Sequence, residues 1–376
     1  MNSTSSKQAP TSQDTRILCL TRKHSVYATG LGLLLTTFCA SSHAEIAINV
    51  PNANLSIYGR VASGVSYVDN IGAAGDSVFR AASNEWGTSL LGLNGSKEIA
   101  PGIQGQIKLE TGFSAANGNS NAGNLFSRFA TVGIKSNTMG TIEFGRSLAY
   151  SNDAWSLDPM GMNWSGVDSL SKGHNWGTWN NTVGYRSPNL SGFEAGLQLS
   201  LGGQAGNNSA GRSLAASLSY THANLNVRAI YDETRDANGK LSDLFNASSE
   251  YIVGATYKIQ STTLFAAYNR ISASDAASGT DTAMDHSWVG VNYQLNPDNL
   301  VRVGLFTAKT DVTNAKANLY TVGWDHKVND ALSLWASAAL MDNNKNAAFP
   351  AVGYWQDAPA PGATQHGINA GFIYVF

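Results

Sequence analysis

The feature that most constrains this chain is an alternation of apolar and polar residues that returns in one short segment after another. In residues 55–62 (LSIYGRVA) the odd positions are apolar or Gly, whereas most even positions are polar or small. The same alternation occurs in residues 193–200, 225–229, 320–325 and 332–337. A period of two is typical of β-strands that have one apolar face. The pattern therefore predicts an all-β protein.

Alternation alone does not separate a β-sandwich from a membrane barrel, so the composition of the two faces is decisive. Gly, Ala, Asn and Arg occupy the polar face, and aromatic residues near strand ends resemble the interfacial girdles of transmembrane barrels: Tyr67, Tyr220, Tyr231, Tyr257, Tyr268, Tyr293 and Trp324. Charged residues make up 13% of the chain, about half of the usual share. After residue 44, no stretch approaches 18 consecutive apolar residues, which excludes a helical membrane protein. These features favour a transmembrane β-barrel.

Sixteen alternating segments can be counted, which predicts a 16-stranded antiparallel barrel. They are residues 53–68, 86–96, 103–114, 126–136, 140–148, 179–187, 191–200, 212–221, 224–233, 249–259, 262–271, 285–294, 300–309, 317–327, 331–341 and 366–376. The connections between them alternate between short turns and long loops, as expected of tight periplasmic turns opposite long outer loops. The long ones are predicted at 69–85, 149–178, 201–211, 234–248, 272–284, 310–316 and 342–365. A barrel of 18 strands remains the alternative.

Residues 1–44 have the order of segments of a secretory signal. A basic patch precedes an apolar run over residues 26–40, and small residues precede Ala44. The run is too short for a convincing membrane span, so a cleaved signal is favoured over an anchor helix. Residues 45–376 would form the barrel domain. Both cysteines, Cys19 and Cys39, fall in the signal, so the exported chain would have neither a disulfide nor a cysteine metal site.

Enzymatic and nucleic-acid functions find little support in the sequence. The near-neutral charge of the chain lacks the basic excess that nucleic-acid binding usually needs. The adjacent pairs Asp285-His286 and Asp325-His326 cannot form catalytic dyads, because neighbours on a strand point to opposite faces. We therefore expect no catalytic residue, no metal site and no cofactor.

Five groups of residues, in this order, make the chain resemble the Gram-negative general-diffusion porins, especially their neisserial and betaproteobacterial branch. The resemblance covers about residues 55–376. The groups are Ile57-Tyr58-Gly59-Arg60; residues 92–98 (GLNGSKE) with 109–113 (LETGF); residues 125–128 (LFSR) with 140–146 (GTIEFGR); residues 181–189 (NTVGYRSPN); and the alternating aromatic residues Phe372, Tyr374 and Phe376.

The resemblance implies a homotrimer of water-filled barrels in the outer membrane of a Gram-negative bacterium, surrounded by lipid and lipopolysaccharide. Ions and small hydrophilic solutes would diffuse passively through each barrel. The third outer loop, 149–178, would fold inward and narrow the pore, with Asp153, Asp158 and Asp168 on the loop. A basic wall would face it, at Arg60, Arg128, Arg146 and Arg186. Strand phase supports this position for Arg60, which lies on the polar face of its segment, and an arginine that faces lipid at the midplane costs about 2–4 kcal/mol. The alternative is that these arginines are solvated at the strand ends.

The chain departs from the family pattern at several positions of the basic wall. Leu90 and Asn94 stand where such porins commonly have Arg and Lys, and Gly184 and Arg186 stand where the neisserial branch usually has Arg and Asp. We therefore expect a thinner or rearranged basic wall.

Tryptophan is concentrated in and beside the third loop, at Trp155, Trp164, Trp176 and Trp179. These rings could stack on solutes, as in sugar-specific channels, or could pack the loop against the barrel wall. A sugar-specific channel is therefore the alternative function.

The C-terminal aromatic residues carry a separate expectation. Phe372, Tyr374 and Phe376 share the predicted lipid face of the last segment, and they resemble the signal that the outer-membrane assembly machinery recognises. With these residues on the lipid face, the last strand would pair with the first strand, and the sheet would have no open edge in lipid.

Overall fold

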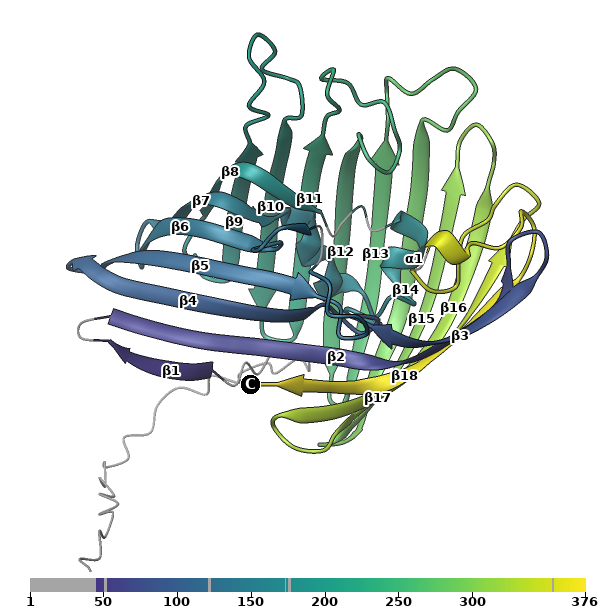
Figure 1. Ribbon diagram of the computed structural model, residues 1–376, viewed down its shortest axis with the longest axis horizontal. Coiled ribbons are helices and arrows are strands. Elements are labelled where there is room, and N and C mark those ends of the chain that lie inside the picture. Colours follow the sequence, from purple (N-terminus) through teal and green to yellow (C-terminus); the bar gives the residue numbers. More distant parts are fainter. Residues whose placement is uncertain (1–44, 51–52, 121–122, 173, 175–176, 354) are drawn as a thin grey trace, which may run out of the picture. The chain divides into compact units, whose positions relative to one another are not determined.

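The structure, a computed structural model, describes residues 45–50, 53–120, 123–172, 174, 177–353 and 355–376 (Figure 1). All of these residues lie in the compact unit Leu35–Phe376. The predicted signal, 1–44, lies outside the described residues. None of the helices in the described part of the chain is long and apolar enough to cross a bilayer.

The described residues form eighteen strands with a few short helical turns. The strands are β1 (Glu45–Val50), β2 (Ala53–Ile71), β3 (Asp76–Ser83), β4 (Ser89–Ala100), β5 (Ile103–Phe113), β6 (Phe129–Ser136), β7 (Gly140–Leu148), β8 (Thr178–Arg186), β9 (Phe193–Ser200), β10 (Ser213–His222), β11 (Leu225–Thr234), β12 (Ser249–Ile259), β13 (Thr262–Ser272), β14 (Ala283–Asn296), β15 (Asn299–Thr310), β16 (Lys316–Lys327), β17 (Leu332–Asn343) and β18 (Gln365–Val375). The helical segments are η2 (Tyr150–Leu157), α1 (Val167–Ser171) and η4 (Trp355–Asp357).

The strands form one closed antiparallel ring. From β4 to β18 each strand is hydrogen-bonded to the next, and β18 pairs with β2 to complete the circle. β3 and β4 lie end to end along β2, where β3 pairs with Ser63–Ile71 and β4 with Asn54–Arg60. They therefore make up one barrel strand, and β1 is an extra strand beside the start of β2. The predicted barrel of sixteen antiparallel strands is confirmed.

The first outer loop is shorter than predicted. We expected a loop over residues 69–85, but β2 continues to Ile71 and residues 76–83 form β3. The break in this barrel strand comes later, at residues 84–88, where Asn84 and Gly87 have positive φ angles of 74° and 144°. The Asn84 side chain holds the break together by accepting from the Ser89 N–H at 2.7 Å and donating to the Phe113 carbonyl at 3.1 Å.

The two faces of the ring alternate as the sequence predicts. On β2, Val65 and Tyr67 are 42% and 37% exposed on the outer face, whereas Ser66 and Val68 are buried on the inner face. Apolar and aromatic side chains cover the outer face of the other strands as well, among them Ile107, Val132, Phe144, Val253, Tyr257, Val289, Tyr293, Leu305, Val322, Trp324 and Ile368. This is the surface that a barrel presents to lipid.

The end of the chain completes the seam between β18 and β2. The Gly59 N–H donates to the Phe376 carbonyl at 2.8 Å, and the Phe376 N–H donates back to the Gly59 carbonyl at 3.0 Å. The Phe376 ring covers Gly59 so closely that a Cβ at position 59 would clash with it. Phe372 and Tyr374 are exposed on the outer face as predicted, while Asn369 is buried on the inner face. The last strand thus pairs with the first, and no strand edge is left open at this point.

We predict that deletion of Phe376 will leave export unchanged but will lower the yield of folded, heat-modifiable barrel about tenfold. The deletion removes two backbone hydrogen bonds of the seam and would leave part of β2 unpaired in lipid, where each unsatisfied group costs several kcal/mol. Folded yield is measured as the fraction that shifts on heating in detergent gels.

Gly59→Val tests the β18–β2 seam without changing the terminal residues that the assembly machinery would recognise. The valine side chain displaces the Phe376 ring but leaves Phe376 itself in the chain. It should lower the folded yield in the same direction. The matched control is Tyr293→Ala, an outer-face aromatic on β14 that is remote from the seam. Normal folding of both seam variants would show that the Gly59–Phe376 contact is dispensable.

Candidate functional site

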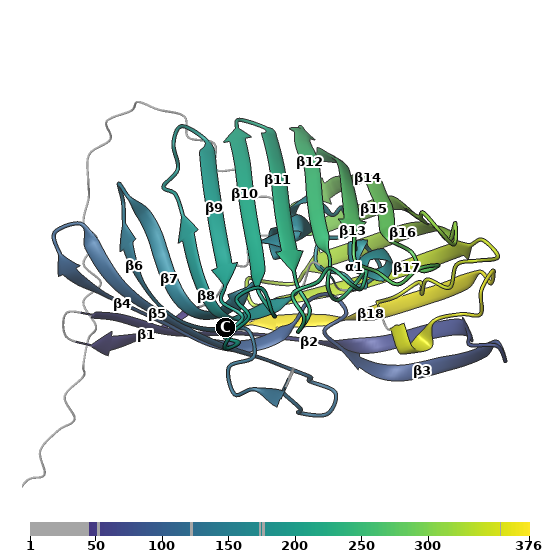
Figure 2. The ribbon, with the colours of Figure 1, turned by 90° about the horizontal axis from the view of Figure 1, so that it is seen from above.

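The loop between β7 and β8, residues 149–177, runs across the inner side of the strands. Its first part, η2, lies against β10–β13. At the end of η2 the Trp288 ring N–H donates to the Leu157 carbonyl at 2.8 Å, and beyond it Arg302 donates to the Pro159 carbonyl at 3.0 Å. These partners lie on β14 and β15, far around the ring from β7 and β8. Figures 1 and 2 show α1, the later part of the loop, on the inner side of the sheet.

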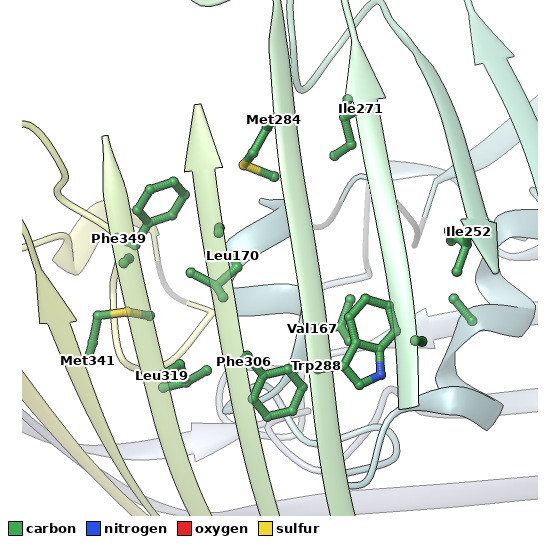
Figure 3. Packing of buried hydrophobic residues seen from close by; sticks show 14 of the residues in the cluster. Val167, Leu170, Ile252, Ile271, Met284, Trp288, Phe306, Leu319, Met341 and Phe349 are labelled. Atoms are coloured by element: carbon green, nitrogen blue, oxygen red, sulfur yellow. The ribbon is translucent and has the colours of Figure 1, made fainter. Parts of the chain in front are cut away.

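Apolar side chains hold this loop against the inner face of β11–β17. Four apolar residues of the loop, Leu157, Met160, Val167 and Leu170, are almost fully buried. Figure 3 shows Val167 and Leu170 among the inward side chains of the strands, which include Ile252, Ile271, Met284, Trp288, Phe306, Leu319 and Met341, together with Phe349 from the last loop. Burial of a side chain of this size contributes about 1.5–3 kcal/mol, so the loop is firmly seated.

Two arginines hold the beginning of the loop through one carboxylate. Asp153 Oδ2 lies 3.0 Å from a terminal nitrogen of Arg186 and 2.7 Å from one of Arg228. Arg186 also covers the ring of Tyr150, with its guanidinium carbon 3.9 Å from the ring centre. Arg186 and Asp153 were both predicted as site residues, and the structure brings them together; Arg228 was not predicted.

A second charged group lies on the other side of the loop, on the wall formed by β2, β4 and β5. Arg128 Nε is 2.6 Å from Glu110 Oε1, and the Tyr58 hydroxyl donates to Glu110 Oε2 at 2.6 Å. Lys108 Nζ is 4.0 Å from the same carboxylate. Arg128 also reaches the Thr88 hydroxyl at 3.3 Å.

Arg60 joins this wall to the loop. Its Nε donates to the Thr88 carbonyl at 3.0 Å, and a terminal nitrogen lies 3.6 Å from the sulfur of Met162 on the loop. The backbone N–H of Trp164 donates to the Glu85 carbonyl at 2.8 Å. Residues 84–88, the break between β3 and β4, are therefore the point where the wall meets the far end of the loop.

Arg146 is placed differently from the other three predicted arginines. It lies on the same face of β7 as Ile142 and Phe144, which are 38% and 47% exposed on the outside of the ring. Its guanidinium donates to the Thr178 hydroxyl at 2.6 Å and to the Asn180 side-chain oxygen at 2.5 Å, and both partners lie on the neighbouring strand β8. The family resemblance grouped Arg146 with the lumenal wall. Near the end of β7 these polar partners satisfy its guanidinium instead.

The other two predicted aspartates are buried within the loop. Asp158 accepts hydrogen bonds from the Met160 and Val167 N–H groups at 2.7 and 2.9 Å. Asp168 packs against Gly353 of the last loop so closely that a Cβ there would clash with its carboxyl. Burial raises the pKa of both carboxyls to about 7, and for Asp168 the neighbouring Asp158 adds to the shift.

The tryptophans of this region have different surroundings. Trp155 lines a cavity of about 290 Å³ together with Lys258, Phe265 and Arg302. Trp179 is buried, and it packs with Ala149, Tyr150 and Ala215. The Trp164 side chain lies near Gly353. Trp176 lies outside the described residues.

Several residues that belong to this site were missed by sequence reasoning. Lys108, Glu110, Arg228 and Arg302 all occupy the polar phase of an alternating strand, which is the signal that placed Arg60 in the lumen. Arg302 forms an ion pair with Asp325, in which Nε and one terminal nitrogen each lie 2.7 Å from Asp325 Oδ2. The position of each charged residue in the apolar–polar alternation of its strand predicts the lumenal side for all four of these residues.

We predict that the barrel loses thermal stability as pH rises from about 4 to about 7. The folded loop binds protons at Asp158 and Asp168 up to about pH 7, whereas the unfolded chain releases them near pH 4, so deprotonation favours unfolding over this range. Asp168→Asn, which stays neutral, should raise the melting temperature at pH 8 by a few degrees and flatten its pH dependence.

The measurement is tryptophan fluorescence during heating in detergent, between pH 4 and pH 8. Asp298→Asn, in an exposed turn, serves as the control and should behave as the wild type. A wild-type melting temperature that rises with pH, or an Asp168→Asn profile equal to that of the wild type, would contradict the prediction.

Comparisons with known proteins agree with this architecture. The profile of the Gram-negative porin family matches residues 31–346. An outer membrane porin protein of Bordetella pertussis is 27% identical over 338 residues, which cover 82% of this chain and 83% of that protein. Outer membrane porin protein 32 of Delftia acidovorans is 24% identical, over 92% of this chain and 99% of its own length.

Solved structures show the same fold. The anion-selective porin from Comamonas acidovorans superposes with a TM-score of 0.75 and 22% identity, over 86% of this chain and 100% of that one. OmpF of Salmonella typhi gives a TM-score of 0.62 at 17% identity, over 88% of this chain and 100% of that one. The family match spans most of the sequence, and the closed ring of sixteen strands is the architecture it requires. The chain therefore belongs to the Gram-negative porin family and is an outer-membrane porin.

Proposed function

We propose that the lumen beside the inward loop is the selectivity site of this porin, and that it favours small anions over cations during passive diffusion. The observation that carries the proposal is the balance of charge around the loop. Among the described residues there, the cations Arg60, Lys108, Arg128, Arg186 and Arg228 outnumber the carboxylates Glu110, Glu143 and Asp153.

These charges gather around shared cavities. Lys108, Glu143, Asp153 and Arg186 line one cavity of about 280 Å³ beside the beginning of the loop. Lys108 and Glu143 also line a neighbouring one of about 320 Å³ on the wall of β4–β7. A charge about 5 Å from a permeating ion contributes about 1.7 kcal/mol at an effective dielectric constant near 40, so a small excess of one sign is enough to set a preference.

The buried carboxyls of the loop do not offset this excess. Asp158 and Asp168 are 4% and 6% exposed, and burial raises the pKa of each to about 7. They act through the conformation of the loop, while Asp153 is the loop carboxylate that remains partly exposed.

We predict that Arg128→Ala will raise the permeability of cations relative to anions several-fold. The substitution removes a cation and leaves Glu110 without its closest counter-charge, so both changes act in the same direction. Asp153→Asn should act in the opposite direction, because Arg186 and Arg228 then lose their shared carboxylate. The measurement is the reversal potential in a salt gradient across a planar bilayer.

The matched control for this experiment is Arg146→Ala, because its guanidinium lies on the outer side of β7. It should leave the reversal potential unchanged. Both lumenal effects should shrink at 1 M salt, where the Debye length falls to about 3 Å. Reversal potentials that stay the same in Arg128→Ala and Asp153→Asn, or that change as much in Arg146→Ala, would overturn the assignment.

The functional unit is proposed to be a homotrimer. The outer face of the ring is apolar over many strands, and one structural neighbour, OmpT of Vibrio cholerae, is described in a trimer form. We predict that unheated detergent gels will show a species near three times the mass of the chain that collapses on boiling. A protein that runs as a monomer after mild extraction would contradict this.

A sugar-specific channel is the second candidate, and the position of Trp155 is the observation that favours it. The ring lines a cavity with Lys258, Phe265, Asn292 and Gln294, a mixture of flat and hydrogen-bonding groups that suits sugars. Liposome swelling with sugars of graded size distinguishes the two functions. Rates that depend on size alone indicate general diffusion, and rates that saturate with one sugar indicate a specific site.

A further inference from the structure

A histidine and two carboxylates meet inside the ring, away from the charges described above. His174 belongs to the last part of the inward loop, Asp232 lies on β11 and Glu250 lies on β12. One ligand atom from each, nitrogen or oxygen, lies within 4.8 Å of the other two. His174 Nδ1 and Glu250 Oε2 are 3.3 Å apart.

The two carboxylates are held next to each other by the sheet itself. Asp232 and Glu250 are directly opposite in the register of β11 and β12, and both point to the inner face. They are 2% and 1% exposed. Like charges that face each other across two strands destabilise the pair, and burial increases that cost. A proton or a metal cation between two buried carboxylates in this position would relieve that cost.

Apart from the 3.3 Å contact between His174 Nδ1 and Glu250 Oε2, the atoms that face one another have no hydrogen-bond partner among the described residues. This holds for His174 Nδ1, Asp232 Oδ1 and Glu250 Oε2, all of which are shielded from solvent. A buried polar atom left in this state costs about 1–3 kcal/mol, and more when it is charged. Three such atoms that converge on one point indicate a ligand for that point.

The surrounding hydrogen bonds fix how the imidazole is oriented. Ser248 Oγ donates its proton to the Leu244 carbonyl at 3.0 Å, so its oxygen is left to accept from His174 Nε2–H at 2.8 Å. The Nδ1 lone pair then points at the carboxylates. Asn269 donates to the other oxygen of Glu250 at 2.6 Å and holds that carboxylate in place. Metal-binding histidines and carboxylates are typically supported by outer hydrogen bonds of this kind.

We propose that His174 Nδ1, Asp232 Oδ1 and Glu250 Oε2 bind a divalent transition-metal ion of the Zn²⁺ type. Two ligands of a tetrahedral Zn²⁺ with bonds of about 2.1 Å are about 3.4 Å apart, which matches the 3.3 Å pair. The doubly charged ion balances both carboxylates. Imidazole as a ligand favours Zn²⁺ over Mg²⁺ or Ca²⁺. A water or the Ser151 hydroxyl, which lies beside Asp232, would complete the four ligands.

The competing occupant of the same position is a proton on His174. Burial lowers the pKa of this imidazole, but the carboxylates of Glu250, Asp232 and Asp243 together outweigh burial and raise the pKa to about 9. An imidazolium would balance only one of the two carboxylates. The metal and the proton bind the same nitrogen, so direct measurement of bound metal decides between them.

The proposed ion would fasten the inward loop to the barrel wall. His174 comes from the end of the loop near β8, whereas the two carboxylates come from β11 and β12. The apolar contacts of Val167 and Leu170 hold the middle of the loop, and Asp153 holds its beginning. The metal would add a third attachment, at the end of the loop that those contacts do not reach.

The test uses the folded, detergent-purified protein, stripped with a chelator, incubated with Zn²⁺ and desalted. We expect one Zn²⁺ per chain by elemental analysis. Co²⁺ in place of Zn²⁺ should give the visible absorption of a tetrahedral nitrogen and oxygen site. Glu250→Gln, Asp232→Asn and His174→Gln should each weaken Zn²⁺ binding at least tenfold.

The matched control is His286→Gln, which replaces another buried histidine of the inner face, on β14, and should retain one Zn²⁺ per chain. Heat-modified mobility shows whether each variant folds, and the Co²⁺ spectrum of the wild type requires no variant at all. Failure of the folded wild type to retain Zn²⁺ would overturn the proposal and leave the proton as the occupant. The proposal would also be overturned if folded Glu250→Gln, Asp232→Asn and His174→Gln retained as much Zn²⁺ as the wild type. A Co²⁺ spectrum equal to that of the aqueous ion would overturn it as well.

Discussion

The pairing of β18 with β2 is the interaction on which the rest of this structure depends. Lipid offers no hydrogen-bond partners, so a sheet can cross the membrane only if every strand has two neighbours. The β18–β2 ladder, continued by the two bonds between Gly59 and Phe376, provides the last of them. Once the ring is closed, each strand has one face toward lipid and one toward the lumen. The alternation along the sequence follows directly from this.

The closed ring leaves an interior that the inward loop divides into two unlike sides. Toward β11–β17 the inner face carries a large apolar cluster, and the loop packs on it through Leu157, Val167 and Leu170. Toward β2–β7 the wall carries the Arg128–Glu110 ion pair, and Lys108 beside it lines a polar cavity. In the proposed function, small ions pass along the charged side of the loop. The seating of one loop thus decides which residues act on permeating ions.

Much of the fold was predictable because strand phase is a local property. Strand number, the outward aromatic residues and the lumenal position of Arg60 all follow from a period of two. The break at residues 84–88 was not predictable, since its Asn84 and Gly87 conformations depend on contacts with β4 and β5. The burial of Asp158 and Asp168 was equally hidden, because it results from packing between two loops that lie about 180 residues apart in sequence. Arg146 shares the phase of Ile142 and Phe144, so its outward position could have been read from the sequence.

The seam also determines when this protein can fold. Gly59 and Phe376 lie at opposite ends of the described chain, so their contact closes a loop that contains nearly the whole barrel. Contacts between such distant residues form late, because the chain entropy of closure must be overcome before they contribute any stability. Until β18 is available, the free edge of β2 can pair with any other strand, including that of another molecule. Closure of the ring must therefore wait until β18 has been made, and until then the nascent barrel keeps an edge that is open to wrong partners.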